Sequence, residues 1–382
     1  MEPHENAICN TDVLSDRLSM AHASRLIRIF TPSFADETDT NAQNLTVKEV
    51  VTRLDSQLFQ VTMLSEGNVD PRIAQRKNTR ILSYYAHGNT PRLLLRILAD
   101  GPDIYFFPRY GPLDRAFLRA RKYLSPNTAL ITYVVMMMNE QTATGMVARL
   151  IKGSDQVYAN STFVSETVQG IFGLHPAAVY DGVDRRFFFP SPTSKDPGKK
   201  LVVLYAGSFQ ARKRVELVIE QAARWPEVEF RLAGKGETEA GCRALVRQRG
   251  CGNVVFLGHL PSSQLGEEMR KADAFLFPSV LEGHPQVLIQ ASACGLPAVA
   301  MSLYRPDAVA HGRTGFLADN DEELARSLDL ILRDTELRGR MSAAAAEHAQ
   351  QFDWDRITRQ WGDIFEETVV RKNRNSRPGA ED

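Results

Sequence analysis

The sequence of 382 residues lacks the features that would mark a disulfide-rich, zinc-binding or membrane-spanning protein. Its four cysteines are Cys9, Cys242, Cys251 and Cys294, and they form neither a CxxC pair nor a cluster with zinc-ligand spacing. We therefore expect reduced, mostly structural thiols. The longest notable apolar run, residues 133–138, is far too short to cross a bilayer.

The chain also lacks an excess of charge of either sign. Its 46 basic and 46 acidic residues give a formal net charge of +0, which argues against nucleic acid as a partner. The first 23 residues contain acidic side chains and no apolar core, so they do not resemble a secretory signal. These observations predict a cytoplasmic protein.

Two common nucleotide-binding motifs are missing. The sequence contains no GxxxxGK[ST], which excludes a P-loop. The stretch AGKGETEAG supplies Gly234 and Gly236, but Glu239 stands where a dinucleotide fingerprint needs its third glycine. A nucleotide or another anion would instead be bound by helix ends and scattered cations.

The sequence does contain short β-rich runs that alternate with helical patterns, which predicts an α/β protein with parallel sheets. The predicted strands are 25–31, 59–65, 79–85, 103–108, 129–135, 155–160, 201–207, 228–234, 253–258, 273–278 and 297–301. A Pro-, Ser- and Lys-containing stretch near residue 195 interrupts the pattern. We predict two doubly wound domains that face each other across a cleft, where ligands bind at the carboxyl ends of the strands.

The expected organisation has six parts. They are a mobile N-terminal tail (1–23), an N-terminal Rossmann-like acceptor domain (24–190), a linker (191–200), a C-terminal Rossmann-like donor domain (201–350), a helix that packs back toward the N-terminal domain (351–370) and a mobile tail (371–382).

The stretch LEGHPQVLIQASACGLPAVA, residues 281–300, combines a carboxylate and a carboxamide with the start of a helix. Pro285 suits the first helical turn, and the free amides of Gln286 and Val287 could bind a phosphate. Gln290 lies one turn after Gln286 on the same side. The spacing alone favours an ordinary capped core helix with an exposed Glu282 and a solvated Gln290 over a ligand site.

The same stretch resembles the signature of retaining GT-B glycosyltransferases, specifically glycosyltransferase family four, also called glycosyl transferases group one. Further segments agree with that family in order: YAGSFQARKRVELVIEQA, RLAGKGE, VVFLGHLPSSQLGEEMRKADAFLFPS and RPDAVAHGRTGFLA. The segment DQVYANSTFVSETVQGIFGLHPAAVYDGVDRRFFFP also resembles the end of the family's first domain. The resemblance covers residues 155–350 and is only general before residue 155.

The resemblance implies roles for individual residues. Glu282 would contact hydroxyls of the donor sugar, and Gln290 stands where the family has a ribose-binding Glu. Lys213 would neutralise the donor diphosphate, and Ser208 replaces the family's usual Arg, so that Arg212 or Arg214 would supply the missing cation. The catalytic candidates are Glu282 and Lys213. The donor-binding candidates are Ser208, Arg212, Arg214, Gly234, Gly236, His259, Gly283, His284, Gln286, Val287 and Gln290.

The acceptor side is less clearly marked, because the family's Gly pair after the first strand and a His after strand 129–135 are both missing here. Asp39, Asn41, Arg109 and Tyr110 are candidates because they follow predicted strand ends. Residues 113–124 form an amphipathic basic pattern, which predicts either a helix packed on the sheet with a solvated basic face or a peripheral contact with the inner face of a membrane.

The resemblance implies a retaining, metal-independent transfer of a sugar from a nucleotide diphosphate sugar to a glycan or lipid-linked acceptor, in polysaccharide or glycolipid biosynthesis. No cofactor beyond the donor co-substrate is expected. Two alternatives remain at this point: a non-catalytic nucleotide-sugar or glycan-binding protein on the same fold, and a nucleotide-sugar epimerase.

Overall fold

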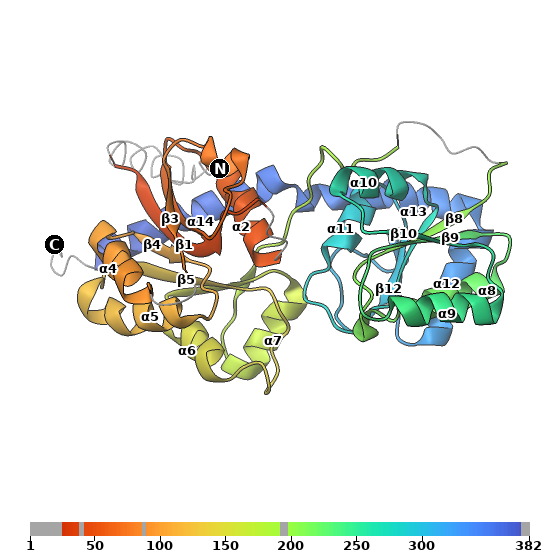
Figure 1. Ribbon diagram of the computed structural model, residues 1–382, viewed down its shortest axis with the longest axis horizontal. Coiled ribbons are helices and arrows are strands. Elements are labelled where there is room, and N and C mark those ends of the chain that lie inside the picture. The colour runs from red at the N-terminus through yellow and green to blue at the C-terminus, as the bar shows by residue number, and fades with distance from the viewer. Residues whose placement is uncertain (1–24, 38–41, 86–88, 192–197, 376–382) are drawn as a thin grey trace, which may run out of the picture.

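A computed structural model describes residues 25–37, 42–85, 89–191 and 198–375. The predicted tail 1–23 and most of the predicted linker 191–200 lie outside the described residues. The chain forms two α/β domains, each built on a parallel sheet (Figure 1). The predicted fold class, two Rossmann-like domains, is confirmed.

The N-terminal sheet has seven strands in the order β3-β2-β1-β4-β5-β6-β7. Its strands are β1 (Ile27–Phe34), β2 (Phe59–Ser65), β3 (Thr79–Ser83), β4 (Ile104–Phe106), β5 (Ala129–Val134), β6 (Gln156–Ala159) and β7 (Ala177–Ala178). Its helices are α2 (Ala42–Arg53), α3 (Pro71–Ala74), α4 (Thr90–Asp100), α5 (Pro112–Leu124), α6 (Gly145–Gly153) and α7 (Thr162–Phe172).

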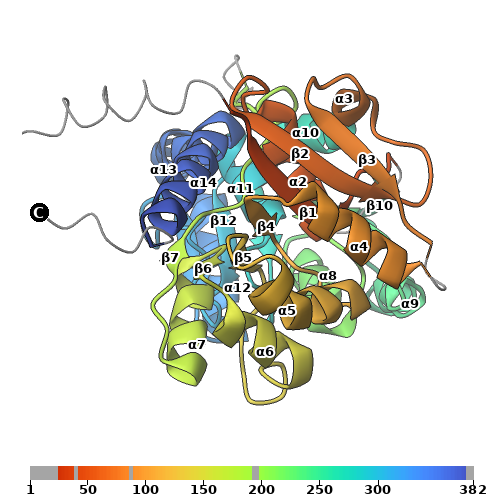
Figure 2. The same cartoon turned by 90° about the vertical axis from the view of Figure 1, so that its left-hand side faces the viewer.

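Both faces of this sheet are covered, as the apolar runs of its strands require. On one face, Val47 and Val51 of α2 and Trp361 of the C-terminal helix pack against strand residues such as Val61. On the other face lie α4, α5 and α6 (Figure 2). Their apolar side chains form one buried cluster with strand residues such as Leu130.

The C-terminal sheet has six strands in the order β10-β9-β8-β11-β12-β13. Its strands are β8 (Val202–Ala206), β9 (Glu229–Ala233), β10 (Val254–Gly258), β11 (Ala274–Phe277), β12 (Ala298–Met301) and β13 (Gly315–Ala318). The helical segments are η1 (Ala211–Lys213), α8 (Val215–Arg224), α9 (Glu239–Arg249), α10 (Ser262–Lys271), α11 (Gln286–Ala293), α12 (Asp321–Arg333), α13 (Thr335–His348) and η2 (Ala349–Phe352). One continuous hydrophobic core fills this domain.

The chain crosses between the domains twice, and the two crossings lie side by side. The backbone N–H of Val183 donates to Phe352 O over 2.7 Å. Gly182 packs so closely on Trp354 that a Cβ there would lie 2.4 Å from the indole ring. The second crossing leads into α14 (Trp354–Asn375), which runs back along the N-terminal domain (Figure 1).

Helix α14 extends beyond the predicted bounds. Residues 371–375, which the sequence pattern placed in a mobile tail, continue the helix, and Lys372 forms an ion pair with Asp155 over 3.0 Å. Residues 376–382 lie outside the described part of the chain.

The carboxyl ends of the two sheets face each other at the domain junction. Val135 follows β5, and its carbonyl oxygen would lie 2.5 Å from a Cβ on Gly283, in the segment after β11. Thr162 donates from its hydroxyl to Asp307, which follows β12, over 2.6 Å. Strand ends that face each other in this way define the region where a ligand is expected.

Candidate functional site

Glu282 is the centre of a cluster of hydrogen-bond donors at the end of β11. Its Oε1 atom accepts from Lys213 Nζ at 2.5 Å, from Arg212 Nη1 at 2.8 Å and from Ser279 Oγ at 2.5 Å. Within the described part of the chain, its other oxygen, Oε2, has no hydrogen-bond partner. One carboxylate oxygen is thus fixed by three donors, and the other remains able to accept from a ligand.

Backbone contacts between two loops hold this cluster together. The N–H of Val280 donates to Arg212 O over 3.0 Å, and Arg212 Nη1 donates to Leu281 O over 2.7 Å. Arg214 ends η1 with a left-handed conformation (φ 52°), which turns the chain into α8. The turn places Arg212 and Lys213 toward Glu282, whereas Arg214 donates to Asp321 over 2.5 Å.

The Lys213 side chain is largely buried and lies against an aromatic ring. Its side chain is only 10% exposed, and its Nζ lies 4.9 Å from the centre of the Phe277 ring. Burial lowers the pKa of Lys213, and the charge of Glu282 opposes that effect. Burial raises the pKa of Tyr304, which the Glu282 charge raises further. The Tyr304 hydroxyl is buried and has no hydrogen-bond partner among the described residues.

Helix α11 begins just after this cluster. Pro285 is its N-cap residue, and the cap makes no side-chain hydrogen bond, so the amides of Gln286 and Val287 remain at the positive end of the helix dipole. Further along α11, Gln290 Oε1 is buried and accepts no hydrogen bond from the part of the chain that the structure describes. This helix start can accept an anion, and Gln290 has an unused acceptor.

Gly283 and His284 join the site to the N-terminal domain. A Cβ on Gly283 would collide with Val135 O, so only glycine permits this approach. The His284 side chain is fully buried, and its Nδ1 lies 3.8 Å from Asp181 Oδ2 without forming a hydrogen bond. The segment that carries Glu282 is therefore positioned by both domains.

Several other predicted donor residues line the ends of neighbouring strands. Ser208 follows β8, and its carbonyl accepts from the Tyr205 hydroxyl over 3.1 Å. A Cβ on Gly234 would lie 1.9 Å from Gly207 O, and one on Gly236 would lie 2.3 Å from Phe209 O. These two glycines thus permit close packing of two loops. His259 follows β10 and is exposed.

Of the four acceptor-side candidates, two lie within the described residues and two lie outside them. Asp39 and Asn41 lie outside the described residues. Arg109 and Tyr110 lie in the loop after β4, and the Arg109 guanidinium lies 4.4 Å from the centre of the Phe34 ring.

Sequence reasoning missed Ser279 and Tyr304. Ser279 follows β11 and precedes Glu282 by three residues, so its position at a strand end was the available signal. Tyr304 follows β12 and gave no comparable signal, because its proximity to Glu282 depends on the order of strands in the sheet.

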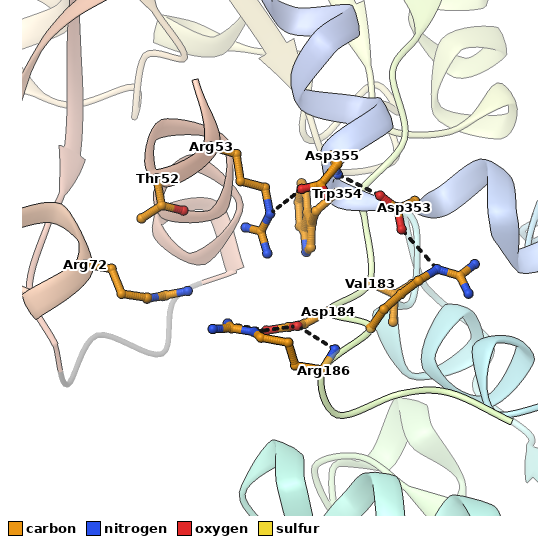
Figure 3. A pocket seen from close by; sticks show the side chains of 10 residues that line it. Thr52, Arg53, Arg72, Val183, Asp184, Arg186, Asp353, Trp354 and Asp355 are labelled. Carbon is orange, nitrogen blue, oxygen red and sulfur yellow. Dashed lines mark hydrogen bonds and ion pairs between the residues drawn. The ribbon is translucent and has the colours of Figure 1, made fainter. Parts of the chain in front are cut away.

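A separate cavity of about 410 Å³ lies beside the two interdomain crossings (Figure 3). It is lined by Thr52, Arg53, Arg72, Val183, Asp184, Arg185, Arg186, Asp353, Trp354 and Asp355. Each arginine is paired with a carboxylate; for example, Arg53 pairs with Asp355 at 3.1 Å and Arg185 with Asp353 at 3.0 Å. The cavity shares no residue with the Glu282 cluster.

The described residues contain no group of three or more His, Cys, Asp or Glu side chains placed to hold a metal ion. In the same residues, every helix is too short or too polar to cross a lipid bilayer.

The C-terminal half is similar to known glycosyltransferases in sequence. Residues 189–348 match the family described as glycosyl transferases group 1. D-inositol 3-phosphate glycosyltransferase of Streptomyces griseus is 28% identical over 270 residues, which are 60% of this chain and 57% of that protein. The Mycobacterium bovis protein of the same name is 32% identical over 230 residues, 55% of this chain and 48% of that protein. The match therefore spans about half the length of these curated relatives.

Solved structures share the whole two-domain arrangement. The Anabaena protein HepE, in a complex with UDP-glucose, superposes with a TM-score of 0.72 at 17% identity and covers 89% of this chain and 99% of its own. A sucrose-phosphate synthase from Thermosynechococcus elongatus has a TM-score of 0.74 at 19% identity, with coverage of 91% and 100%. The predicted resemblance is confirmed: residues 189–348 match the glycosyl transferases group 1 family model, and the chain as a whole has a GT-B fold.

Proposed function

We propose that this protein transfers a sugar from a nucleotide diphosphate sugar to a hydroxyl group of a glycan or lipid-linked acceptor. The observation that carries the proposal is the convergence of Arg212, Lys213 and Ser279 on one oxygen of Glu282, immediately before the start of α11. This arrangement combines a free carboxylate oxygen for sugar hydroxyls with cations and helix amides for a diphosphate.

In this proposal, the donor diphosphate lies at the start of α11. Arg212 and Lys213 stabilise the negative charge that grows on it as the glycosidic bond breaks. The departing phosphate oxygen takes the proton of the acceptor hydroxyl on the same face of the sugar, and the new bond keeps the anomeric configuration. Glu282 Oε2 orients the sugar. The cations and amides perform the role that a metal ion has in other transferases, so we propose a metal-independent reaction without a further cofactor.

The solved structures support the choice of donor, because HepE has been observed with UDP and with UDP-glucose. We therefore propose a UDP-sugar as the first donor to test. The proposal also includes a cytoplasmic enzyme of polysaccharide or glycolipid biosynthesis that contacts the inner face of a membrane through residues 113–124.

The decisive experiment incubates the protein with UDP-, GDP- and ADP-sugars, with and without acceptors, and measures release of the nucleotide diphosphate. The acceptor panel includes D-inositol 3-phosphate, which the names of the sequence relatives contain. Glu282→Gln should lower the rate about 100- to 1000-fold, the usual effect of removing one electrostatic contact to the reacting centre. Glu336→Gln, at a side chain that is 85% exposed on α13, is the matched control and should leave the rate unchanged.

NMR of the product then tests retention of the anomeric configuration. Inversion would overturn the proposed mechanism. Binding of donors without any release of nucleotide would favour a non-catalytic binding protein, and conversion of the donor sugar without an acceptor would favour an epimerase.

A further inference from the structure

The order of strands identifies a second place where a ligand is expected. In the N-terminal sheet, β1 and β4 are neighbours, and the chain proceeds from β1 toward β3 on one side and from β4 toward β7 on the other. Doubly wound sheets bind ligands outside the carboxyl ends of the strands at this reversal point. Phe34 ends β1, and the loop of residues 107–111 follows β4.

The 107–111 loop has a strained backbone. Phe107 and Tyr110 both have positive φ angles, 57° and 62°, which are uncommon for residues other than glycine. Such conformations are costly, and they persist where surrounding contacts enforce them, often at functional sites.

Two buried or half-buried side chains enforce this shape. The Asp114 carboxylate, on α5, accepts from the backbone N–H groups of Arg109 and Gly111 at 3.1 Å and 2.8 Å, and from the Tyr105 hydroxyl at 2.7 Å. From α2, Gln43 Nε2 donates to the carbonyl oxygen of Phe107 over 3.1 Å. The loop is therefore fixed in one arrangement before any ligand binds.

The fixed loop presents the Arg109 guanidinium. This group lies on the face of the Phe34 ring, 4.4 Å from its centre, and is partly buried. Among the described residues no carboxylate lies within ion-pair distance of Arg109, whereas the arginines of the cavity beside the two interdomain crossings are all paired. Burial raises the pKa of Asp114, and the nearby charge of Arg109 opposes that rise. A guanidinium offers its N–H donors in a planar fork that matches a phosphate.

The position of Arg109 relative to Glu282 follows from the sheet. Strand β5 is the neighbour of β4, and Val135 at its end is in contact with Gly283. Neighbouring strands are ~4.8 Å apart, so the loop that carries Arg109 lies one strand away from the contact beside Glu282. An acceptor bound at Arg109 would thus lie at the same edge of the sheet as the Glu282 cluster, on the β1 side of β4.

We propose that the acceptor carries a phosphate group and that Arg109, supported by Phe34, binds it. This inference rests on the proposed function for the identity of the ligand as an acceptor, but the binding of a phosphate at Arg109 can be tested without sugar transfer. The phosphate could belong to a small soluble polyol phosphate or to a phospholipid headgroup.

The first experiment is calorimetric titration of the full chain, in the presence of UDP, with glycerol 3-phosphate, glucose 6-phosphate and their unphosphorylated parents. The wild type should bind the phosphates and not the parents. Arg109→Gln should weaken that binding about ten- to a hundredfold, because a charge-assisted contact is lost. Arg109→Lys should give an intermediate value, since an ammonium group lacks the planar fork. Arg96→Gln, at an exposed side chain on α4, is the matched control.

The second experiment measures sugar transfer to the same compounds and to vesicles that contain phosphatidylinositol. A raised KM for the phosphorylated acceptor in Arg109→Gln, with no such change in Arg96→Gln, supports the inference, and transfer only to the vesicles assigns the phosphate to a lipid. If Arg109→Gln binds and uses phosphates like the wild type, the inference is overturned, whereas the proposed function stands. If phosphates bind through Arg109 but no acceptor receives sugar from any donor, the phosphate site stands and the proposed function fails.

Discussion

At the scale of single residues, the two oxygens of Glu282 have different environments. Oε1 is held by Arg212, Lys213 and Ser279, and the Ser279 hydroxyl is its only uncharged donor among the described residues. Ser279 is fully buried and also lies within 3.3 Å of Arg212 O. We infer that Ser279 is a positioning residue, which fixes the direction in which Oε2 points.

Ser279→Ala should therefore lower kcat about tenfold with little change in the KM for the donor, because the carboxylate loses orientation and keeps its charge. Ser279→Thr, which retains a hydroxyl, should recover part of the loss. Steady-state kinetics, with the donor that gives nucleotide release in the assay above, would measure both values. If Ser279→Ala lowers the thermal stability together with kcat, and Ser279→Thr restores neither, the result would indicate that Ser279 has a merely structural role.

The burial of Lys213 predicts that kcat/KM for the donor depends on pH. Burial lowers its pKa below the ordinary value of 10.5, so the free protein loses this positive charge at a lower pH than an exposed lysine would. The value of kcat/KM for the donor should then fall as the pH rises through that lowered pKa, because kcat/KM reports the ionisation of the free enzyme.

Lys213→Arg should move this alkaline fall to higher pH, since a guanidinium remains charged there. Lys271→Arg, at a side chain that is 48% exposed on α10, should leave the profile unchanged. An alkaline limb that is identical in wild type and Lys213→Arg would show that another group controls it.

Gln290 predicts an effect on nucleotide affinity. Its buried Oε1 has no partner among the described residues, and an amide accepts more weakly than a carboxylate. Gln290→Glu should keep or tighten the binding of UDP in calorimetry, by up to about tenfold, because charge-assisted hydrogen bonds to ribose hydroxyls are stronger than neutral ones. Gln248→Glu, at an exposed position on α9, controls for the added charge. A large loss of affinity would mean that the ribose lies elsewhere.

At the scale of the elements, α5 combines a buried face with an exposed end. Leu113 and Phe117 pack into the core, whereas Tyr123 and Leu124 are 76% and 64% exposed. Arg121 forms an ion pair with Asp155 over 2.7 Å. The other basic side chains of this helix are Arg115, Arg119 and Lys122. Exposed apolar side chains beside basic ones are typical of peripheral membrane contact.

The protein should therefore sediment with vesicles that contain phosphatidylglycerol at low salt, and substitution of Arg115, Arg119 and Lys122 by Gln should release it. Each basic residue near an anionic surface contributes ~1 kcal/mol to binding. Replacement of Arg326, Arg340 and Arg371 by Gln removes the same charge from exposed sites on other helices and should have little effect. If the wild type stays in the supernatant, membrane contact through α5 is excluded.

The elements also show what the sequence could predict. All eleven predicted strands exist, because runs such as residues 202–206 are apolar, β-branched and flanked by turns. Strands β7 and β13, with two and four residues, were missed, since short edge strands carry little pattern. The pattern likewise placed the end of α14 too early, because its polar last turn resembles a tail.

The site was predictable to a similar degree. The resemblance singled out Lys213 and Glu282, and the fold brings them into contact at 2.5 Å. It left open which arginine joins them, because the direction of Arg212 and Arg214 depends on the turn at the end of η1. Phe34 could not be found, since its contact with Arg109 joins strands that are far apart in the sequence.

At the scale of the whole molecule, α14 follows the C-terminal domain in the sequence but forms part of the core of the N-terminal domain. The helix leaves the C-terminal domain at Trp354 and supplies core residues to the N-terminal domain. Trp361 is fully buried there, with ring centres of Phe106 and Tyr133 at 4.8 Å and 5.1 Å. The N-terminal sheet therefore lacks part of its own core unless the C-terminal end of the chain is in place.

Trp361→Ala should accordingly destabilise the N-terminal domain in particular, by ~3–5 kcal/mol, because it leaves a large cavity beneath the sheet. Hydrogen exchange at increasing urea concentration would resolve the two halves. Amides of β1 and β5 should lose protection at lower urea than in the wild type, whereas amides of β8 and β11 should be affected much less, since their core contains no residue of α14. Glu367→Ala, at a side chain that is 67% exposed on the same helix, should change neither half. Equal loss of protection in both halves of Trp361→Ala would instead mean that the domains unfold as one unit, through the contacts at their junction.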